Sequence, residues 1–549
     1  MTSSAILSHP IMPIADLPID DGLATALVSS TVEHGEQLKG RRVWLACSGG
    51  RDSLALAALC VQLYRQDKLP FLPQLLHVDH GLQADSKVWA GHVARWAKVQ
   101  NLPCHILPTQ VQGYDEQAAR QARYDVMRAH INQDDVLLLA HHADDQAETV
   151  LMRLIQGAGV NGLSGMQPWR IQDRDGHRNI LWRPWLTVRR AQISAYAQRL
   201  KLPYIDDPTN DTGDNMRSGL RRDIMPVLAT YNPNVIDNIA RSAQLLSDAQ
   251  VIINAQAEDD LQQAAVASLQ QYPEQRVVNI NTLQRLPLSR QRQLLHHWIS
   301  QDEPLPPAKQ LVNDALALSQ RHDHDHQTQI FWQGVHRSYV IRRYREHMYR
   351  LSTQWLNWLK LPLNIQSQRL DMVAETSVNS SSDDNQCISF ILRSSVELVW
   401  QAQIMPNALT RVLKHQSYNH NHNHSHKNEI EIRFAPLRRL QRVQTAMASR
   451  PQAGKKLYQT LGVPVWLRDS LVVVSATFVG KDDIASGDMA SMESKLATNE
   501  RAVELPILLL SPFDSWVLGT DTLNRAIEEE QLTKLINSCL RPSNALYVI

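Results

Sequence analysis

Between Val43 and Gln156 the sequence alternates four times between a short apolar run and a longer segment with helical spacing. The apolar runs are VWLACS, QLLHV, CHILPT and VLLLAHH, and the segments that follow them are SLALAALCVQLY, SKVWAGHVARWAKVQ, DEQAARQARYDVMRAH and DDQAETVLMRLIQ. Strands that alternate with helices of this length form βαβ units, whose burial on both faces favours a parallel, doubly wound sheet. We therefore expect an α/β fold with ligands beyond the carboxyl ends of the strands.

The rest of the chain divides by its pattern. After Tyr231 the spacing is helical over long stretches, and β-branched runs return after Glu429. Two tracts, SVNSSSDDNQ and NHNHNHSHKNE, are too polar to form a packed core. The predicted regions are an N-terminal extension, the α/β catalytic domain, a helical middle domain, a linker with low-complexity inserts, and a small α+β C-terminal domain with a tail, at residues 1–36, 37–232, 233–352, 353–428 and 429–549.

Composition narrows the class of protein. The formal net charge is +1, and no run of about eighteen apolar residues occurs, which disfavours a membrane span. The first twenty residues lack the basic segment of a secretory signal peptide and contain Asp16 and Asp20. The five cysteines include no CxxC pair, which argues against a disulfide framework or a thiolate metal site. We expect a soluble cytoplasmic protein with no membrane partner.

The sharpest local signal is SGGRDS at Ser48–Ser53, where the first strand ends and its helix begins. Glycines allow backbone amides to approach a phosphate group, and the start of a helix adds partial positive charge. Asp52 beside bound phosphates would repel them unless a divalent cation lies between, so Mg²⁺ is implied with the nucleotide. The alternative is a plain turn capped by serine or aspartate, which is a common structure.

Two other nucleotide-binding motifs were compared with the sequence, and neither supports the enzyme class that it usually marks. The sequence contains no GxxxxGK[ST], which disfavours a P-loop phosphotransferase. GxGxxG occurs at Gly157–Gly162, but it follows a helix, whereas a dinucleotide-binding motif follows a strand.

Asp145 and Glu148 follow the fourth apolar run and are three residues apart, so on a helix they share one face. Together they could hold a cation such as a lysine ammonium group. Two alternatives stay open: acids that complement a helix dipole, and a zinc site formed by His141, His142 and Asp145.

Arg217 and Arg221 lie in a basic segment after a turn-rich stretch, and arginine forks suit phosphate or adenylate oxygens. The alternative is the solvated start of a charged helix. Further basic clusters occur around residues 342–345 and 433–456. Separate basic clusters in a nearly neutral chain indicate a long polyanion, such as a tRNA, that is contacted at several points.

These segments together carry a family resemblance. SGGRDS resembles the SGGxDS signature of the N-type ATP pyrophosphatase, or PP-loop, superfamily. With HVDHGLQADS, EQAARQARYD, HHADDQAETVLMRLIQGAGVNGLSGM, RPWL and MRSGLRRDIMPVL, it resembles the tRNA(Ile)-lysidine synthetase family, densely over residues 42–228. The segments QRQLLHHWI and GKKLYQTLGVPVWLRDS resemble that family's second and C-terminal domains. The resemblance implies that residues 429–549 include a tRNA-binding domain, which contacts the acceptor stem.

The resemblance implies a ligase that uses ATP to adenylate the C2 oxygen of the wobble cytidine in the CAU anticodon of tRNA(Ile). L-lysine then displaces AMP to give lysidine, which changes decoding from AUG to AUA. It also implies roles for residues at matching positions. Ser48, Gly49, Gly50, Arg51, Asp52 and Ser53 would bind ATP, Asp52 would bind Mg²⁺, Asp145 and Glu148 would bind lysine, and Arg120, Arg217 and Arg221 would contact adenylate or cytidine.

Some positions depart from the family pattern. Arg217 is followed by Ser218 where the family usually has asparagine, and MASRPQAGKK replaces a glycine-rich lead into the C-terminal module. The rival interpretations are a tRNA thiolase of the same superfamily, which would ordinarily need paired cysteines, and an RNA-binding protein on a degenerate nucleotide-binding scaffold. The sequence predicts no oligomeric state.

Overall fold

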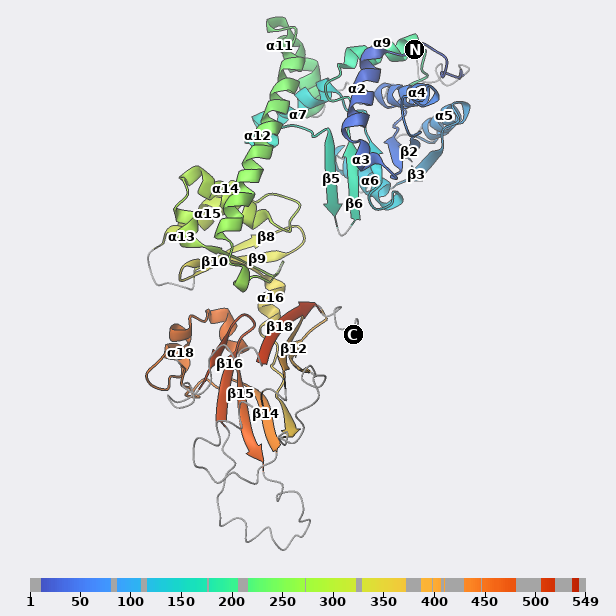
Figure 1. Cartoon of the computed structure of the whole chain (residues 1–549). Coiled ribbons are helices and arrows are strands. Elements are labelled where there is room, and N and C mark those ends of the chain that lie inside the picture. The colour runs from blue at the N-terminus through green and yellow to red at the C-terminus, as the bar shows by residue number, and fades with distance from the viewer. Residues whose placement is uncertain are drawn as a thin grey trace, which may run out of the picture. The chain divides into compact units, whose positions relative to one another are not determined.

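The computed structural model describes residues 11–79, 86–109, 116–174, 177–205, 216–271, 273–321, 328–371, 387–396, 398–405, 409, 429–445, 447–479, 505–518 and 536–542. The chain divides into two compact units, Met1–Gln256 and Ala257–Ile549. The boundary falls within a long helix, α12 (Val235–Ala264), which Figure 1 shows in green.

The first unit is built on a sheet whose strands, among the described residues, run in the order β3-β2-β1-β4-β6-β5. The strands are β1 (Val43–Ala46), β2 (Gln74–Asp79), β3 (Cys104–Pro108), β4 (Val136–Leu138), β5 (Trp169–Arg174) and β6 (His177–Trp182). All neighbours pair in parallel except β5, which is antiparallel to β6 at the edge of the sheet. The predicted doubly wound α/β fold is confirmed, and the edge hairpin, visible in Figure 1, is an addition that the sequence pattern did not predict.

Helices cover both faces of this sheet. They are α2 (Asp21–Glu33), α3 (Gly35–Leu38), α4 (Arg51–Arg65), α5 (Ser86–Val99), α6 (Glu116–His130), α7 (Ala143–Ile155), α8 (Val160–Leu163), α9 (Arg190–Arg199), α10 (Met216–Gly219), a π-helical turn (Leu220–Ile224) and α11 (Met225–Tyr231). Because side chains alternate along a strand, Val43 and Leu45 join the apolar core under α4 and α9, whereas Trp44 joins the core under α6.

The region expected to be an N-terminal extension is part of this unit from residue 11 onward. Ile14, Leu23 and Leu27 are buried in the same core as α4. Gln62 of α4 donates to the carbonyl oxygens of Ile14 and Leu17, at 3.0 and 2.8 Å. These contacts anchor the segment before α2 to the helix that follows the phosphate loop.

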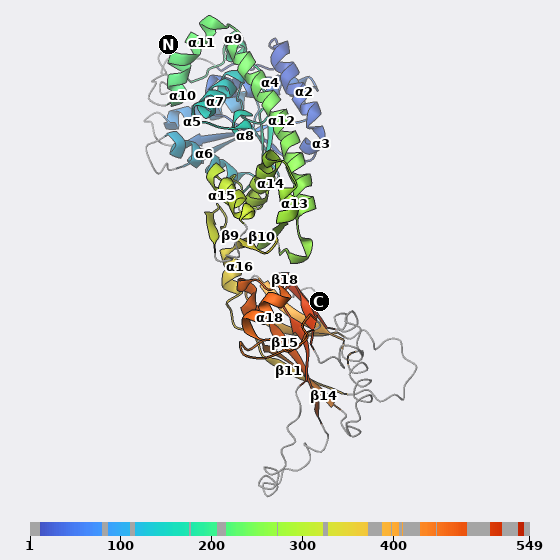
Figure 2. The ribbon, with the colours of Figure 1, turned by 90° about the vertical axis from the view of Figure 1, so that its left-hand side faces the viewer.

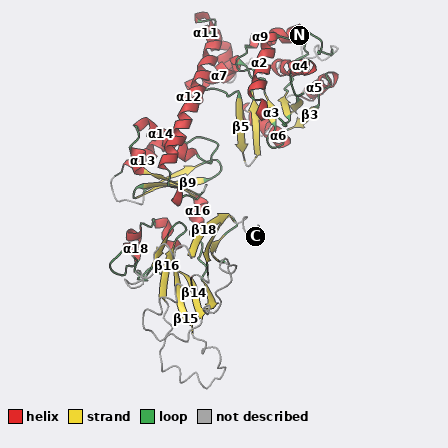
Figure 3. Cartoon of the chain, viewed as in Figure 1, coloured by secondary structure: helices red, strands yellow, loops and turns green. Residues whose placement is uncertain are grey.

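The second unit begins with helices and an antiparallel sheet. Its first elements are a 3₁₀ turn (Ala267–Leu269), β7 (Gln275–Asn279), α13 (Ile280–Gln284), α14 (Leu288–Ser300), α15 (Lys309–Gln320), β8 (Gln329–Gln333), β9 (Ser338–Tyr344) and β10 (His347–Ser352). The strands pair in the order β7-β10-β9-β8. The middle region, predicted to be helical, therefore also contains a sheet (Figure 3). The sequence pattern gives no sign of this sheet, because β9 and β10, labelled in Figure 2, bury several residues in succession and lack the period of two that marks a half-buried strand.

The C-terminal part of the chain is mainly β structure. It contains α16 (Thr353–Trp358), β11 (Gln366–Asp371), β12 (Ile388–Ser394), β13 (Leu398–Ile404), β14 (Glu429–Pro436), α18 (Gly454–Leu461), a 3₁₀ turn (Val465–Ser470), β15 (Val472–Val479), β16 (Leu505–Leu510), β17 (Ser515–Val517) and β18 (Ile536–Pro542). Its sheets have the orders β11-β14-β15-β16-β17 and β12-β13-β18, so strands from the expected linker at 353–428 belong to them. Most of the two polar tracts lies outside the described residues.

No helix in the described part of the chain has the length and apolar character needed to cross a membrane.

Candidate active site

The predicted phosphate loop joins the end of β1 to the start of α4. Gly49 has a φ of +84°, and a Cβ atom on it would lie 2.9 Å from Val93 Cγ2, so this position requires glycine. Ser48 Oγ accepts a hydrogen bond from the N–H of Gly50 at 3.2 Å, and Ser53 Oγ donates to the Gly50 carbonyl oxygen at 3.0 Å. These bonds hold the loop so that the first amides of α4 can face a bound phosphate.

The loop forms one wall of a cavity of about 340 Å³. The cavity is lined by Ala46, Cys47, Ser48, Gly50, Asp52, Ser53, Leu76, His77, Val78, Asp79, Trp89, Arg123, Tyr124, Met127, Leu139, Ala140, His141, Asp145 and Ile205. Many of these residues lie at or just beyond the carboxyl ends of β1, β2 and β4, where a doubly wound sheet binds its ligands. His77 donates from Nδ1 to the Cys47 carbonyl oxygen at 2.9 Å and thereby ties β2 to the loop.

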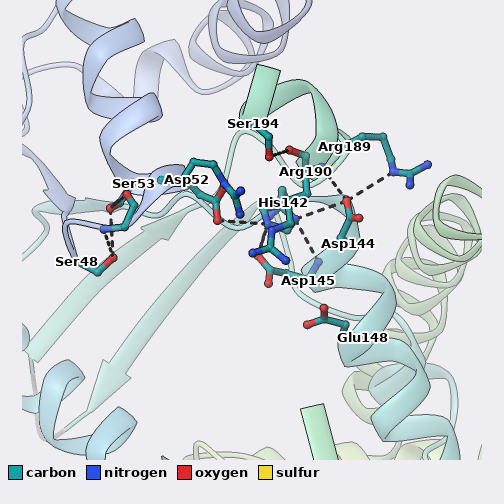
Figure 4. A network of polar contacts seen from close by, with 12 residues as sticks. Ser48, Asp52, Ser53, His142, Asp144, Asp145, Glu148, Arg189, Arg190 and Ser194 are labelled. Atoms are coloured by element: carbon teal, nitrogen blue, oxygen red, sulfur yellow. Dashed lines mark hydrogen bonds and ion pairs between the residues drawn. The ribbon is translucent and has the colours of Figure 1, made fainter. Parts of the chain in front are cut away.

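His142 joins the phosphate loop to the acids on α7. Its Nδ1 accepts the backbone N–H of Asp145 at 3.3 Å and caps α7, so Nε2 carries the ring proton. That nitrogen lies 3.4 Å from Asp145 Oδ2 and 3.7 Å from Asp52 Oδ2 (Figure 4). Asp52 and Asp145 therefore meet on one buried histidine.

The charges in this cluster are mutually stabilised. Burial alone would raise the pKa of Asp52, but His142, Arg51 and Arg190 hold the pKa of that carboxyl below its usual value. Burial would also raise the pKa of Asp145, and His142 among its neighbours lowers it. For His142 itself, the nearby carboxylates outweigh burial and raise its pKa. Both acids are thus held in the charged form that binds cations.

Asp52 is the described residue of the loop that could hold a metal ion beside a nucleotide. Its Oδ1 is buried and accepts no hydrogen bond in the described structure. Across the same described residues, no group of three or more His, Cys, Asp or Glu side chains forms a metal site. A Mg²⁺ ion at Asp52 would therefore take its other ligands mainly from phosphate oxygens and water, which is how Mg²⁺ commonly binds beside nucleotides.

Glu148 lies one turn after Asp145 on the same side of α7, as predicted (Figure 4). Its carboxylate accepts hydrogen bonds from Arg217 Nε at 2.8 Å and from Arg221 Nε and Nη2 at 2.7 and 2.9 Å. Arg217 and Arg221 also lie 3.6 and 3.8 Å from Asp145 Oδ1. The structure thus pairs the acids with the two arginines, whereas the sequence suggested separate roles for them.

Most of the predicted site residues meet at this edge of the sheet. The contacts run from Asp52 through His142 and Asp145 to Glu148, with Arg217 and Arg221 around the last of these. Arg51 lies 3.5 Å from Asp52. Arg120 lies on α6, but its side chain is outside the described residues.

The GxGxxG segment has a structural part to play in this unit. Arg153 of α7 donates to the carbonyl oxygens of Gly162 and Gly165, each at 2.8 Å. These bonds fix the GxGxxG loop against α7. The phosphate loop is a different segment, at Ser48–Ser53.

The sequence motifs give no indication of much of the apolar wall of the cavity. Trp89, Met127 and Ile205 line it from separate parts of the chain. The N–H of Ile205 donates to the Gly49 carbonyl oxygen at 3.0 Å, so this distant residue also supports the phosphate loop. None of the three carries a motif, and only the folded chain brings them together.

The cysteine thiols near the cavity are not activated. Cys47 lines the cavity, and burial raises the pKa of its thiol to about 12. Burial raises the pKa of Cys104 to about 11, and that of Cys60 is raised further. These thiols stay protonated at neutral pH and so are poor nucleophiles.

The second unit presents basic side chains at its surface. Arg345 on the turn between β9 and β10 is exposed, and Arg342 packs over the ring of Trp466 at 5.5 Å. The exposed basic residues around α18 are Arg438, Arg439, Arg442, Arg450, Lys455 and Lys456. The predicted cluster around 433–456 is thus largely solvent-facing, as a nucleic-acid contact requires, whereas in the cluster around 342–345 only Arg345 is exposed and Arg342 and Arg343 are half-buried.

Comparison with known families places the fold and the loop in one class of enzyme. Residues 24–228 match the PP-loop domain, and residues 279–349 match the TilS substrate binding domain. The fold, the phosphate loop and these matches define an ATP-using PP-loop enzyme with a second, substrate-binding region.

Full-length relatives give the particular family. The chain is 37% identical over 542 residues to the tRNA(Ile)-lysidine synthase of Psychrobacter sp. (strain PRwf-1), covering 94% of this chain and 99% of that protein. It is 40% identical over 268 residues to the tRNA(Ile)-lysidine synthase of Pseudomonas aeruginosa, covering 48% and 59% of the two chains. The chain therefore belongs to the tRNA(Ile)-lysidine synthase family, and the predicted resemblance is confirmed.

A solved structure also aligns with part of the chain. The U34-tRNA thiolase NcsA from Methanococcus maripaludis, with its [4Fe-4S] cluster, aligns with a TM-score of 0.33 and 19% identity, covering 41% of this chain and 79% of that one. A likeness this weak carries no conclusion about function.

Proposed function

We propose that this chain joins L-lysine to C2 of the wobble cytidine in the CAU anticodon of tRNA(Ile), with ATP converted to AMP and pyrophosphate. ATP-dependent formation of lysidine on tRNA(Ile) is the activity for which the family is named. The observation that carries the proposal is the contact path Asp52–His142–Asp145, because it joins the phosphate loop to the acids that would select an amino-acid substrate.

The reaction divides into two balanced steps. In the first, the C2 oxygen of cytidine attacks the α-phosphorus of ATP, and pyrophosphate leaves. In the second, the ε-amine of lysine attacks C2, the C2–O bond breaks, and AMP leaves with that oxygen. An ammonium nitrogen has no lone pair, so the ε-ammonium group must first lose one proton to water and attack as a free amine. A second proton leaves the nitrogen for water as the C–N bond forms.

The residues of the loop would act in the first step. Amides at the start of α4 and the hydroxyls of Ser48 and Ser53 would hold the phosphates, and Asp52 would bind Mg²⁺, which neutralises charge that develops on pyrophosphate. His142 would hold Asp52 and Asp145 at a constant separation, so that nucleotide and amine bind in register.

The acids of α7 would act in the second step by binding the amino acid. Asp145 lines the cavity beside the loop, and Glu148 is buried next to it. The exposed basic residues of the second unit would contact the tRNA backbone. A tRNA substrate places this proposed activity in the cytoplasm.

The alternative functions are less well supported. A thiolase would ordinarily use reactive cysteines, and the thiols of Cys47, Cys60 and Cys104 are held protonated by burial. A degenerate RNA-binding scaffold has no need for a cavity that combines a turn requiring glycine with charged, buried carboxylates.

The deciding experiment is incubation with ATP, labelled L-lysine and an unmodified tRNA transcript with a CAU anticodon. We expect label in the RNA and one AMP released per lysine, and no label with Asp52→Asn. Asp67→Asn, at an exposed position two residues after the end of α4, is the matched control and should retain the activity. Label that appears equally with Asp52→Asn, or its absence with the unaltered chain, would contradict the proposal.

A further inference from the structure

Arg189 joins two carboxylates that come from different helices. Its Nη1 donates a hydrogen bond to Asp237 Oδ2 at 3.0 Å, and Asp237 lies in the first turn of α12. Its Nε lies 3.5 Å from Oδ2 of Asp144, in the first turn of α7 (Figure 4). One guanidinium group therefore connects α12 to the helix that carries Asp145 and Glu148.

Asp144 belongs to the same polar cluster as the phosphate loop. Its Oδ2 accepts the backbone N–H of Arg190 at 2.8 Å and lies 3.7 Å from Nδ1 of His142. Through its other ring nitrogen, His142 contacts Asp52 and Asp145. A displacement of Asp144 would therefore disturb the group that holds these two acids together. Reactions that depend on aligned groups are slowed by shifts of about 1 Å.

The first half of α12 lies over a cavity in the first unit. This cavity of about 340 Å³ lies between the helix, at Asp237 and Gln244, and the segments around Gln146 and Leu186. Residues 235–256 of the helix are all described, and Ala243 is the single buried apolar side chain among them. Little apolar packing therefore fixes this half of the helix, and the ion pair at its first turn contributes to its position.

The helix α12 also continues from one unit into the other. It runs for 30 residues and passes the boundary after Gln256. A continuous helix is a stiff element, so a displacement of its later turns also moves its first turn. The second unit contains the exposed basic residues that are proposed to contact the tRNA. Contact with RNA there would therefore be felt at Asp237.

We propose that Arg189 is a positioning residue that couples α12 to the nucleotide-binding cluster, so that RNA and ATP each strengthen the binding of the other. This inference rests on the proposed function and adds a regulatory contact to it. The Nε of Arg189 is buried and donates no hydrogen bond to another described residue. A small rotation of the side chain, following Asp237, would bring Nε within hydrogen-bonding distance of Asp144 Oδ2.

The contact between Arg189 and Asp237 is suited to a reversible link. Their side chains are 33% and 47% exposed. An ion pair between partly exposed side chains contributes little to stability, because water solvates both groups when they separate. The helix can therefore leave and regain this contact easily. The His142 side chain, by contrast, is 2% exposed, so the contacts that receive the signal are buried.

The test measures how RNA changes the affinity for nucleotide. Calorimetry gives the Kd of a non-hydrolysable ATP analogue with Mg²⁺, with and without a saturating amount of the CAU transcript. For the unaltered chain we expect the transcript to lower this Kd about ten-fold, and the analogue to lower the Kd of the transcript by the same factor. Asp237→Asn and Arg189→Gln should each reduce the effect to about two-fold or less.

The combined variant Arg189→Gln with Asp237→Asn should show no further loss, because both substitutions remove the same contact. Asp237→Glu keeps a carboxylate at this exposed position and should retain most of the effect. A purely structural role would move the melting temperature, which should stay nearly the same in all of these variants.

Asp248→Asn is the matched control, because Asp248 is an exposed aspartate of the same helix. Its Oδ1 accepts a hydrogen bond from Gln244 at 2.9 Å, within α12. This variant should keep the full ten-fold effect of the transcript on the analogue.

Three results would overturn the inference. They are an effect of the transcript that both Asp237→Asn and Arg189→Gln leave unchanged, an equal loss in Asp248→Asn, and a transcript that binds the unaltered chain without changing its affinity for the analogue. Failure of the proposed function gives a different result, because the unaltered chain would then release no AMP with ATP, lysine and the transcript.

Discussion

Each unit of the chain has a carboxylate held by two arginines, and the two clusters are built differently. In the second unit Asp302 accepts hydrogen bonds from Arg276 and Arg350. Arg350 has no exposed surface, donates also to the Ile299 carbonyl oxygen at 2.7 Å, and lies 4.5 Å from the ring centre of Tyr339. A carboxylate, a carbonyl oxygen and an aromatic ring thus hold the Arg350 guanidinium group on several sides.

In the first unit Arg217 and Arg221, which hold Glu148, are 20% and 25% exposed. Arg217 also donates to the Asp145 carbonyl oxygen at 3.3 Å and to Thr149 Oγ1 at 3.4 Å. The same kind of ion pair thus has a fully buried arginine in the second unit and partly exposed arginines in the first. The difference lies in whether the guanidinium group can turn toward solvent when its carboxylate is removed.

The largest expected effect is that of Glu148→Gln on activity. We expect lysine-dependent AMP release to fall by about 10²–10³-fold, because the bound lysine loses a charged partner. Stability should fall by only about 1–2 kcal/mol, since the freed arginines can turn to water. Glu36→Gln, an exposed glutamate of the same unit, is the control, and a stability loss as large as the activity loss would show that Glu148 is structural.

Asp302→Asn should give the opposite pattern. It leaves the buried Arg350 without its carboxylate, so we expect the second unit to lose about 3 kcal/mol of stability. Hydrogen exchange in peptides from β9 and β10 would measure this loss. The adenylation chemistry of the first unit should change much less, and Asp314→Asn on the exposed face of α15 should have no comparable effect.

His142→Asn should reduce activity less than Glu148→Gln, because it removes only the contact between Asp52 of the phosphate loop and Asp145 of α7. Asparagine can still cap α7, but it cannot reach both Asp52 and Asp145. We expect kcat to fall about ten-fold and half-maximal activity to need more Mg²⁺, with thermal stability nearly unchanged. An unchanged Mg²⁺ dependence would show that the acids and the phosphate loop act independently.

The smallest effect concerns acid stability of the second unit. Burial would raise the pKa of Asp302, but Arg276 and Arg350 hold it below its usual value. A carboxyl whose pKa is lowered in the folded state stabilises it above the unfolded pKa of about 3.9, and this contribution is lost as the pH falls further. Unfolding of Asp302→Asn should therefore depend less on pH below about 4 than that of the unaltered chain, and equal slopes would contradict this.

Local patterns in the sequence predicted the parallel sheet and the phosphate loop, because strand and helix periods and the SGGRDS turn are properties of short segments. They also predicted that Asp145 and Glu148 share a helix face. Pairings between distant segments could not be predicted in this way. The sheet formed by β7 to β10, and the contact of Arg217 with Glu148, 69 residues away, depend on the folded chain.

The apolar wall of the cavity could not be predicted from local patterns either. Trp89 and Ile205 carry no signal that marks them as ligand contacts, because an apolar residue that lines a cavity looks in sequence like one that fills a core. The reaction itself comes from membership of the family, because the sequence pattern alone does not identify the substrates. The roles of Asp52, Asp145, Glu148, Arg217 and Arg221 remain predictions, as does that of Arg120.

The π-helical turn at Leu220–Ile224 has a consequence for anyone who engineers this enzyme. Such a turn holds an extra residue compared with a regular helix, and it is usually less stable. Deleting one residue there would restore ordinary helical geometry and could make the protein more heat-resistant, yet it would rotate Arg221 relative to Arg217. Thermostabilised versions selected for melting temperature alone would then keep their fold and lose the hydrogen bonds that join Arg221 to Glu148.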